Sequence, residues 1–217
     1  MNYKDWLFTI ISTGILVALV IIIVQLSSIK KTNGTALGQQ AQQQTQPQDS
    51  MHGPAQPADA KIFSGLVGKT APDFTLPSYN GETVKLSSLR GKNVILFFNE
   101  GLMCYPACWN QVTAFGKDTV LKNKNTVVLN IMVDPKKDWQ EAVTKMPELA
   151  TATVLLDTDK KVSNLYGVLS LASSMHRGQF PGHSYVIIDN KGVVRFAQDD
   201  PDMAIRNKEL TIEIDKL

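Results

Sequence analysis

Residues 38–60 contain almost no side chain that could enter a hydrophobic core, and this stretch divides the chain into parts that fold separately. It reads GQQAQQQTQPQDSMHGPAQPADA, where Met51 is the only large apolar residue. Such a segment cannot bury enough surface to offset the entropy it would lose on ordering. We predict a flexible Gln/Pro-rich linker over residues 31–60, between an N-terminal anchor of residues 1–30 and a folded domain of residues 61–217.

The N-terminal segment carries an uncharged run from Trp6 to Ile29. Its central part, Leu7 to Leu26, has the length that crosses a hydrocarbon core of ~30 Å. A cleaved signal peptide would have a shorter apolar region, followed closely by a small-residue cleavage site, and no convincing site of this kind follows here. The run is therefore predicted to be an uncleaved transmembrane helix that anchors the protein in the cell membrane.

Two arguments about the orientation of this helix disagree. Lys4 precedes the apolar run, and Lys30 and Lys31 follow it, so the positive-inside rule slightly favours a cytoplasmic C-terminus. A chain with only 2 cysteines, however, avoids unwanted disulfides, which suits an oxidising compartment. We expect an extracytoplasmic domain and leave the conflict open.

Residues 61–217 alternate short apolar runs with helical patterns. Asn93–Phe98 (NVILFF) and Thr126–Val133 (TVVLNIMV) are typical of buried strands, and a helical segment follows each of them. Ser184–Asp189 and Gly192–Ala197 form two further strand patterns, and the Asn-Lys-Gly between them predicts a hairpin. The alternation predicts an α/β fold with a mixed central sheet and helices on both faces. The C-terminal tail fits either a strand or a helix.

The charge pattern excludes one class of partner. The formal net charge is +2, and no block of like charges gathers in the sequence. Nucleic-acid binding is therefore not expected.

The only cysteines of the chain, Cys104 and Cys108, lie in the stretch FFNEGLMCYPACWNQ directly after a predicted strand. Pro106 is a favourable first residue for the next helix, which places both thiols near a helix N-terminus. The helix dipole stabilises a thiolate there, and residues four apart on a helix are close enough for a disulfide. We expect a redox-active disulfide that needs no cofactor; the alternative is two inert buried thiols.

The motifs around this pair resemble the alkyl hydroperoxide reductase and thiol-specific antioxidant family, the peroxiredoxin-like branch of the thioredoxin superfamily. The family's opening resembles VGKTAPDFTLPSYNGETVKLSSLRGKNVILFF, its later Asp-x-Asp…Tyr-Gly-Val stretch resembles LLDTDKKVSNLYGV, and its penultimate hairpin resembles GHSYVIIDNKGVVR. The resemblance covers about Val67 to Ala197. It implies a thioredoxin-like fold and a thiol-based oxidoreductase that reduces hydroperoxides or protein disulfides and is recycled by an external thiol.

The active-site stretch departs from the family pattern. Thioredoxin-type reductases carry Cys-x-x-Cys, whereas this chain has Cys-x-x-x-Cys, and neither cysteine has the Pro and the Thr or Ser that usually precede a peroxidatic cysteine. Gln111 does follow Cys108 at the family's spacing. The position of the thioredoxin cis-proline falls on His183, which could act as acid, base or thiolate partner, or could only satisfy a turn. Further supporting candidates are Pro181, Glu100 and His176.

The family's two mechanisms assign opposite roles to the cysteines. Cys104, in the loop EGLMC, is expected nearer to solvent and should attack if the substrate is a protein disulfide. Cys108, inside the first helical turn, should attack if the substrate is a hydroperoxide.

A third possibility belongs to another class of protein. Cys-x-x-x-Cys with a distant histidine resembles the copper-binding triad of Sco-type copper-assembly proteins, and two thiolates with an imidazole suit copper. A metallochaperone using Cys104, Cys108 and His183 is therefore the alternative. The proline that usually follows each cysteine in those proteins is replaced here by Tyr105 and Trp109.

Overall fold

The structure is a computed structural model that describes residues 57–217. The predicted transmembrane helix and nearly all of the predicted linker lie outside these residues. Within the described part of the chain, no helix is both long and apolar enough to cross a membrane.

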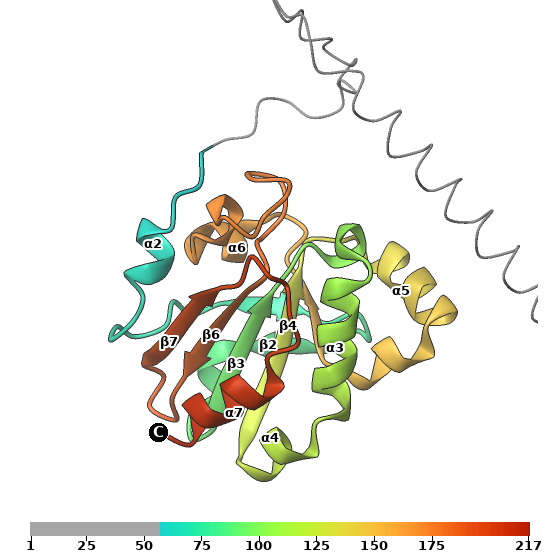
Figure 1. Ribbon diagram of the computed structural model, residues 1–217. Coiled ribbons are helices and arrows are strands. Elements are labelled where there is room, and N and C mark those ends of the chain that lie inside the picture. The colour runs from blue at the N-terminus through green and yellow to red at the C-terminus, as the bar shows by residue number, and fades with distance from the viewer. Residues whose placement is uncertain (1–56) are drawn as a thin grey trace, which may run out of the picture. The chain divides into compact units, whose positions relative to one another are not determined.

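The described residues form a central sheet with helices packed around it (Figure 1). The strands are β1 (Thr75–Pro77), β2 (Thr83–Lys85), β3 (Asn93–Phe98), β4 (Thr126–Met132), β5 (Val154–Leu156), β6 (Ser184–Ile188) and β7 (Val194–Asp199). The α-helices are α2 (Lys61–Ser64), α3 (Ala107–Lys117), α4 (Thr119–Asn123), α5 (Lys136–Lys145), α6 (Lys161–Leu165) and α7 (Asn207–Ile214). The 3-10 helices are η1 (Leu86–Leu89), η2 (Gly101–Cys104), η3 (Pro147–Thr151) and η4 (Val168–Ser170).

The central sheet is mixed, as the sequence predicted. Its order is β5-β4-β3-β6-β7. The β3–β4 and β4–β5 pairs are parallel, whereas β3–β6 and β6–β7 are antiparallel. β1 and β2 form a separate two-stranded antiparallel sheet. β3 is the centre of the main sheet, so the segment that follows it begins in the middle of the domain.

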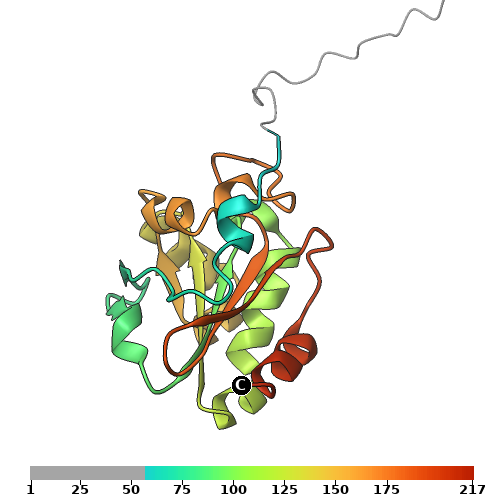
Figure 2. The same cartoon turned by 90° about the vertical axis from the view of Figure 1, so that its left-hand side faces the viewer.

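Successive residues of β3 point to opposite faces of the sheet, and each face packs against its own hydrophobic core. Ile95 and Phe97 belong to a core shared with α3, α5 and α7. Leu96 and Phe98 belong to a second core, shared with α2, α6 and η1. Figure 2, which shows the sheet from the side, places helices on both of its faces. The prediction of helices on both faces is confirmed.

The C-terminal tail, which the sequence left ambiguous, is a helix. Leu210 and Ile214 of α7 are buried, whereas Ile212 between them is 58% exposed. A spacing of four places the buried pair on one helical face. The tail therefore packs on the α3 face of the sheet instead of extending it.

A tight turn leads from β3 into the cysteine segment. The side chain of Asn99 accepts a hydrogen bond from the backbone N–H of Gly101 at 2.9 Å. Gly101 has φ +57°, and a Cβ built on it would lie 1.6 Å from Oδ2 of Asp134. Only glycine fits this approach. After η2 the chain enters α3 at Ala107, one residue later than expected, with Pro106 in the N-cap position.

Candidate redox site

The two cysteines form a disulfide at the carboxyl end of β3. Cys104 is the last residue of η2, and Cys108 is the second residue of α3. Their Cα atoms are 5.3 Å apart, within the range that a disulfide requires. The spacing of the pair had predicted this closure, although a 3-10 helix and an α-helix supply the two residues instead of one continuous helix.

The expectation that Cys104 lies near solvent is wrong. Its exposed fraction is only 3%, and that of Cys108 is 0%. Sγ of Cys104 contacts Sδ of Met203 at 3.8 Å. Met203 belongs to the loop between β7 and α7, nearly a hundred residues further along the chain. A local sequence pattern cannot show that this distant loop packs against the sulfur.

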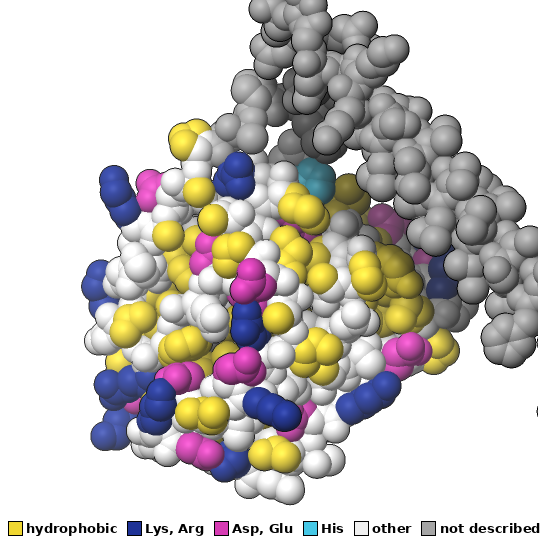
Figure 3. All heavy atoms as spheres, viewed as in Figure 1, with side chains coloured by type: hydrophobic (Ala, Val, Ile, Leu, Met, Phe, Trp, Pro, Cys, Tyr) yellow, Lys and Arg dark blue, Asp and Glu magenta, His cyan; other side chains and the backbone are white. Residues whose placement is uncertain are grey.

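Large hydrophobic side chains surround the buried sulfurs. Met103 and Tyr105, the neighbours of Cys104, are 52% and 65% exposed. The ring of Trp109 packs edge-on against Tyr105, and its indole N–H donates to the carbonyl of Gly101 at 3.0 Å. Figure 3 shows yellow hydrophobic side chains near α3 and α5, with Lys, Arg, Asp and Glu side chains spread over the rest of this face. The exposed side chains on either side of Cys104 are thus apolar.

His183 contacts the second cysteine. Its Nδ1 lies 3.4 Å from Sγ of Cys108, and its ring packs edge-on against Phe97 of β3. Burial lowers the pKa of His183 to about 4, and the carboxylate of Asp200 only partly opposes this shift. The imidazole is therefore neutral at pH 7 beside the disulfide.

A hydrogen-bond network holds the far side of the imidazole. Nε2 of His183 lies 2.8 Å from the hydroxyl of Tyr185, which is 3.2 Å from Oε1 of Gln111. Asp200 lies 4.0 Å from the same Nε2 and forms an ion pair with Arg206. Burial alone would raise the pKa of Asp200, but the hydrogen bonds and charge of Arg206, together with His183 and the backbone N–H of Ala204, keep this pKa below its usual value. Both neighbours of Nε2 are thus fixed in place.

Several of these residues were not among the candidates predicted from the sequence. Tyr185 could have been found, since it is two residues after His183 in a predicted strand and therefore shares its face of the sheet. Met203, Asp200 and Arg206 carry no comparable signal, because they lie in a loop whose position depends on the tertiary fold.

Glu100, His176 and Pro181 are close in sequence to the site but show no hydrogen bond to either sulfur within the described residues. The buried carboxylate of Glu100 accepts hydrogen bonds from the backbone N–H of Met175 at 2.7 Å and from Nδ1 of His176 at 3.0 Å. It therefore ties the segment after η4 to the start of η2. Pro181 is buried just before His183, and its peptide bond is trans.

The AhpC/TSA family profile matches residues 67–197. The chain belongs to this family. A putative peroxiredoxin of Entamoeba histolytica is 32% identical over 165 residues, which cover 69% of this chain and 66% of that protein. The chloroplastic peroxiredoxin Q of Triticum aestivum is 35% identical over 148 residues, covering 64% of this chain and 62% of that protein. The matched region thus spans less than two thirds of the length of these two relatives.

A solved structure supports the AhpC/TSA assignment. The mitochondrial 2-Cys peroxiredoxin from Plasmodium falciparum superposes with a TM-score of 0.59 at 29% identity, covering 70% of this chain and 93% of that one. The thioredoxin-like fold expected from the sequence is therefore confirmed for the described domain.

The copper-chaperone alternative is not favoured in this AhpC/TSA domain. One ligand atom each from Cys104, Cys108 and His183 lies within 4.8 Å of the others. The two sulfurs are bonded to each other, however, and copper would need both as free thiolates. The geometry that brings the three residues together is equally that of a disulfide beside an imidazole, and the similar proteins are peroxiredoxins.

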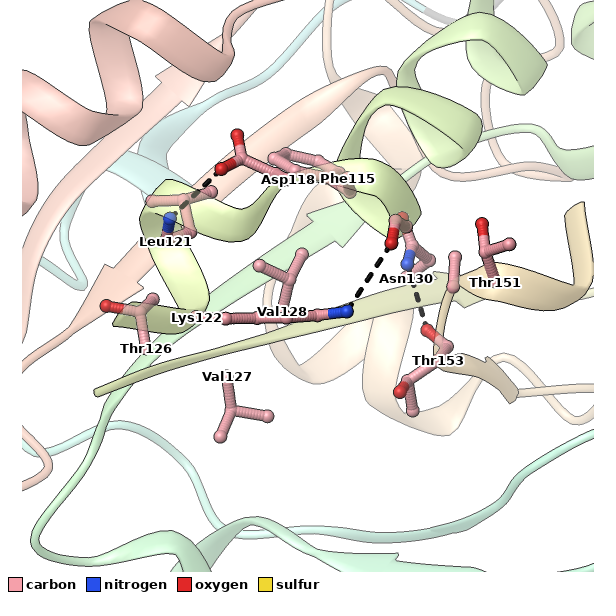
Figure 4. Close-up of a pocket in the computed structure, with 12 residues that line it drawn as sticks. Phe115, Asp118, Leu121, Lys122, Thr126, Val127, Val128, Asn130, Thr151 and Thr153 are labelled. Atoms are coloured by element: carbon pink, nitrogen blue, oxygen red, sulfur yellow. Dashed lines mark hydrogen bonds between the residues drawn. The ribbon is translucent and has the colours of Figure 1, made fainter. Parts of the chain in front are cut away.

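A separate cavity of about 220 Å³ lies at the opposite end of α3 (Figure 4). It is lined by Phe115, Asn130 and Thr151, among others, and Nζ of Lys122 reaches across it to the carbonyl of Gly116 at 3.5 Å. Neither cysteine lines this cavity, so it is not part of the redox site.

Proposed function

We propose that this AhpC/TSA domain is a thiol-dependent peroxidase in which Cys104 and Cys108 alternate between dithiol and disulfide. The observation that carries the proposal is the pair of buried sulfurs, bonded to each other, with a neutral imidazole 3.4 Å from one of them. Family membership and the names of the similar proteins support the same activity.

The reaction balances with these two sulfurs alone. One thiolate attacks a hydroperoxide oxygen, breaks the O–O bond and becomes a sulfenic acid, while the other oxygen takes a proton and leaves as an alcohol. The second thiol then displaces water from the sulfenic acid and forms the disulfide. Two equivalents of an external thiol reduce this disulfide and are themselves oxidised to a disulfide.

Burial of the sulfurs favours a hydroperoxide over a protein disulfide as the oxidant. Exposed fractions of 3% and 0% leave no surface for a folded protein to approach. A hydroperoxide is small and needs far less exposed sulfur surface than a folded protein does. The exposed apolar side chains of Met103 and Tyr105 suit an alkyl hydroperoxide.

The test is hydroperoxide consumption by the full-length protein with dithiothreitol, beside an insulin-reduction assay. We expect turnover with cumene hydroperoxide and little insulin reduction. Cys104→Ser and Cys108→Ser should each abolish turnover, whereas Val120→Ala, a change at an exposed apolar position of α4, should not. Failure of the wild-type protein to consume hydroperoxide, or full turnover in both serine variants, would show that this function is wrong.

We also propose that residues 1–30 anchor the protein in the cell membrane with the redox domain outside the cytoplasm. The support is the uncharged apolar run and the use of only 2 cysteines. Protease added to intact cells should remove the domain, and carbonate extraction should leave the protein in the membrane. If the domain is protected from protease until the cells are lysed, it lies in the cytoplasm and the proposed orientation is wrong.

A further inference from the structure

We propose that Tyr185 is a positioning residue that holds His183 as its Nε2–H tautomer, so that Nδ1 accepts the proton of the Cys108 thiol. The inference rests on the proposed peroxidase function and adds to it the identity of the attacking cysteine. The tautomer follows from assigning each hydrogen-bond donor and acceptor in the network. The assignment begins at two groups whose roles are fixed by their partners, the Asn207 amide and the backbone N–H of Arg206.

The first fixed point is the amide of Asn207. Its Nδ2 lies 2.6 Å from a carboxylate oxygen of Asp118 and 3.3 Å from the carbonyl of Ala114. Both of these oxygens can only accept at neutral pH, so the Asn207 nitrogen must face them. Oδ1 of Asn207 is therefore an acceptor, and the Gln111 atom 2.8 Å from it must be the donating Nε2.

The second fixed point is the other end of the Gln111 amide. Its Oε1 accepts the backbone N–H of Arg206 at 2.8 Å, a donor whose direction cannot change. Both ends of the Gln111 side chain thus give the same orientation. The Gln111 atom that faces the Tyr185 hydroxyl is consequently an acceptor.

The hydroxyl of Tyr185 has one proton and three neighbours. Oε1 of Gln111 at 3.2 Å and the carbonyl of Ala204 at 3.3 Å can only accept. If the hydroxyl proton pointed to His183 instead, both of these oxygens would face the phenol oxygen with no proton between them. The proton therefore points to one of the two acceptors, and the phenol oxygen accepts from Nε2–H of His183 at 2.8 Å.

The charged groups around the imidazole favour the same tautomer. Oδ2 of Asp200 lies 4.0 Å from Nε2, so its negative charge favours a proton on that nitrogen. Arg206 is paired with Asp200 and weakens this effect without reversing it. The uncharged Phe97 ring packs on the imidazole from β3. With the proton on Nε2, the lone pair of Nδ1 faces Sγ of Cys108.

This arrangement distinguishes the two cysteines. The low pKa of His183 belongs to the form in which the neighbouring disulfide is uncharged. When the disulfide is reduced, the negative charge of a Cys108 thiolate favours the protonated imidazole, so the S–H can pass its proton to Nδ1 and give a thiolate beside an imidazolium. Sγ of Cys104 faces the thioether of Met203, which is at most a weak acceptor. Cys108 is therefore the sulfur that attacks the hydroperoxide, the imidazolium returns its proton to the departing alkoxide, and Cys104 closes the disulfide.

The first test is the tautomer itself, measured by nitrogen-15 NMR of the imidazole rings in the full-length protein at pH 7. The chain has 3 histidines, and comparison with His183→Asn assigns the signals of this ring. We expect a protonated Nε2 and an unprotonated Nδ1 in the disulfide form of the wild-type protein. Tyr185→Phe should show a mixture of the two tautomers. A protonated Nδ1 with an unprotonated Nε2 in the disulfide form would overturn the proposal, whereas protonation of both nitrogens after reduction is the ion pair that the proposal expects.

The second test measures the Cys108 thiol in a Cys104→Ser background. The pH at which iodoacetamide alkylation is half-maximal should lie below the value of about 8.5 for a free thiol. Tyr185→Phe should raise this pH by about 0.5–1 unit, as expected for the loss of one hydrogen bond. Tyr166→Phe is the matched control, because it removes another buried tyrosine hydroxyl, which donates to the carbonyl of Pro72 at 2.7 Å on the other face of the sheet.

The outcomes separate this inference from the function on which it rests. If the wild-type protein does not consume hydroperoxide, the proposed peroxidase function is wrong, whichever tautomer His183 adopts. Normal consumption with equal alkylation profiles in Tyr185→Phe and Tyr166→Phe contradicts only the role of Tyr185. A shifted profile in Tyr185→Phe alone, together with the expected tautomer, supports the inference.

Discussion

Met203 covers Cys104, although it lies in a loop and is itself only partly buried. It has φ +49°, and its Sδ is 3.8 Å from the sulfur of Cys104. Its loop is held at both ends by the Asp200–Arg206 ion pair. The reach of an external thiol to the disulfide therefore depends on this single side chain and the loop that carries it.

Truncation of Met203 should accelerate reduction of the disulfide by a bulky thiol. Met203→Ala removes the thioether from Cys104, and we expect glutathione to reduce the disulfide roughly threefold to tenfold faster, since the rate depends on access to the attacked sulfur. Stopped-flow fluorescence of the reduction would measure this. Met103→Ala is the control, because that side chain is 52% exposed and adjacent in sequence. Equal acceleration in both variants would contradict a covering role for Met203.

Position 101 requires glycine mainly because its backbone lies close to the carboxylate of Asp134, and less because of its left-handed φ. A left-handed residue with a Cβ costs about 1–2 kcal/mol, but here the Cβ would also overlap the carboxylate of Asp134. We expect Gly101→Ala to lower the free energy of unfolding by about 3 kcal/mol, measured by urea denaturation. Gly68 has φ +82° with open space around it, so Gly68→Ala should lower the free energy of unfolding only by the backbone strain of about 1–2 kcal/mol. Similar losses at the two positions would contradict the overlap.

At the scale of elements, the end of β4 supports the start of η2 through Asp134. The backbone N–H of Leu102 donates to this carboxylate at 3.3 Å. Burial raises the pKa of Asp134 to about 6, that hydrogen bond opposes the shift, and the charge of Asp138 adds to it. The folded protein therefore holds a proton on Asp134 more tightly than the unfolded chain does.

This raised pKa predicts a loss of stability as the pH rises. The contribution of protonated Asp134 is complete below the unfolded value of about 3.8 and disappears as the pH passes through about 6. Between pH 4 and pH 7, the free energy of unfolding of the wild-type protein should fall by about 2–3 kcal/mol relative to Asp134→Asn. Urea denaturation at both pH values measures the difference. Parallel pH profiles for the two proteins would contradict it.

At the scale of the whole domain, the packing extends to residues before the predicted boundary at Lys61. The backbone N–H of Asp59 donates to the carbonyl of Ser170 at 2.8 Å, and the hydroxyl of Ser170 donates back to the carbonyl of Asp59. Phe63 of α2 is only 2% exposed and packs in the core on the face opposite α3. Helix α2 is therefore part of the folded domain.

A shortened chain that begins at residue 57 should unfold in one cooperative transition, because it keeps both core clusters and the Asp59 hydrogen bonds. Differential scanning calorimetry would show a single peak. Phe63→Ala in this chain should cost about 3 kcal/mol, as for other large core truncations. Aggregation of the shortened chain, or no loss of stability in Phe63→Ala, would contradict the boundary.

The sequence by itself determined the fold class and the disulfide. Near-continuous apolar runs identified β3 and β4, and two strand patterns joined by a turn sequence identified the β6–β7 hairpin, since a strand that is buried on both faces needs apolar residues at nearly every position. The pairing of Cys104 with Cys108 followed from their separation along the chain, which is a local property. His183 became a candidate because the family resemblance places it at the position of the thioredoxin cis-proline, where an imidazole could act as acid, base or thiolate partner.

Only the tertiary structure decided how the two sulfurs differ. Burial of Cys104 depends on Met203, and the orientation of His183 depends on Tyr185 and Gln111, which sit on separate elements. The C-terminal tail likewise became a helix because its apolar residues at 210 and 214 meet the core beside α3. Such contacts join residues far apart in sequence, and their energies arise only once the chain is packed, so no local pattern encodes them.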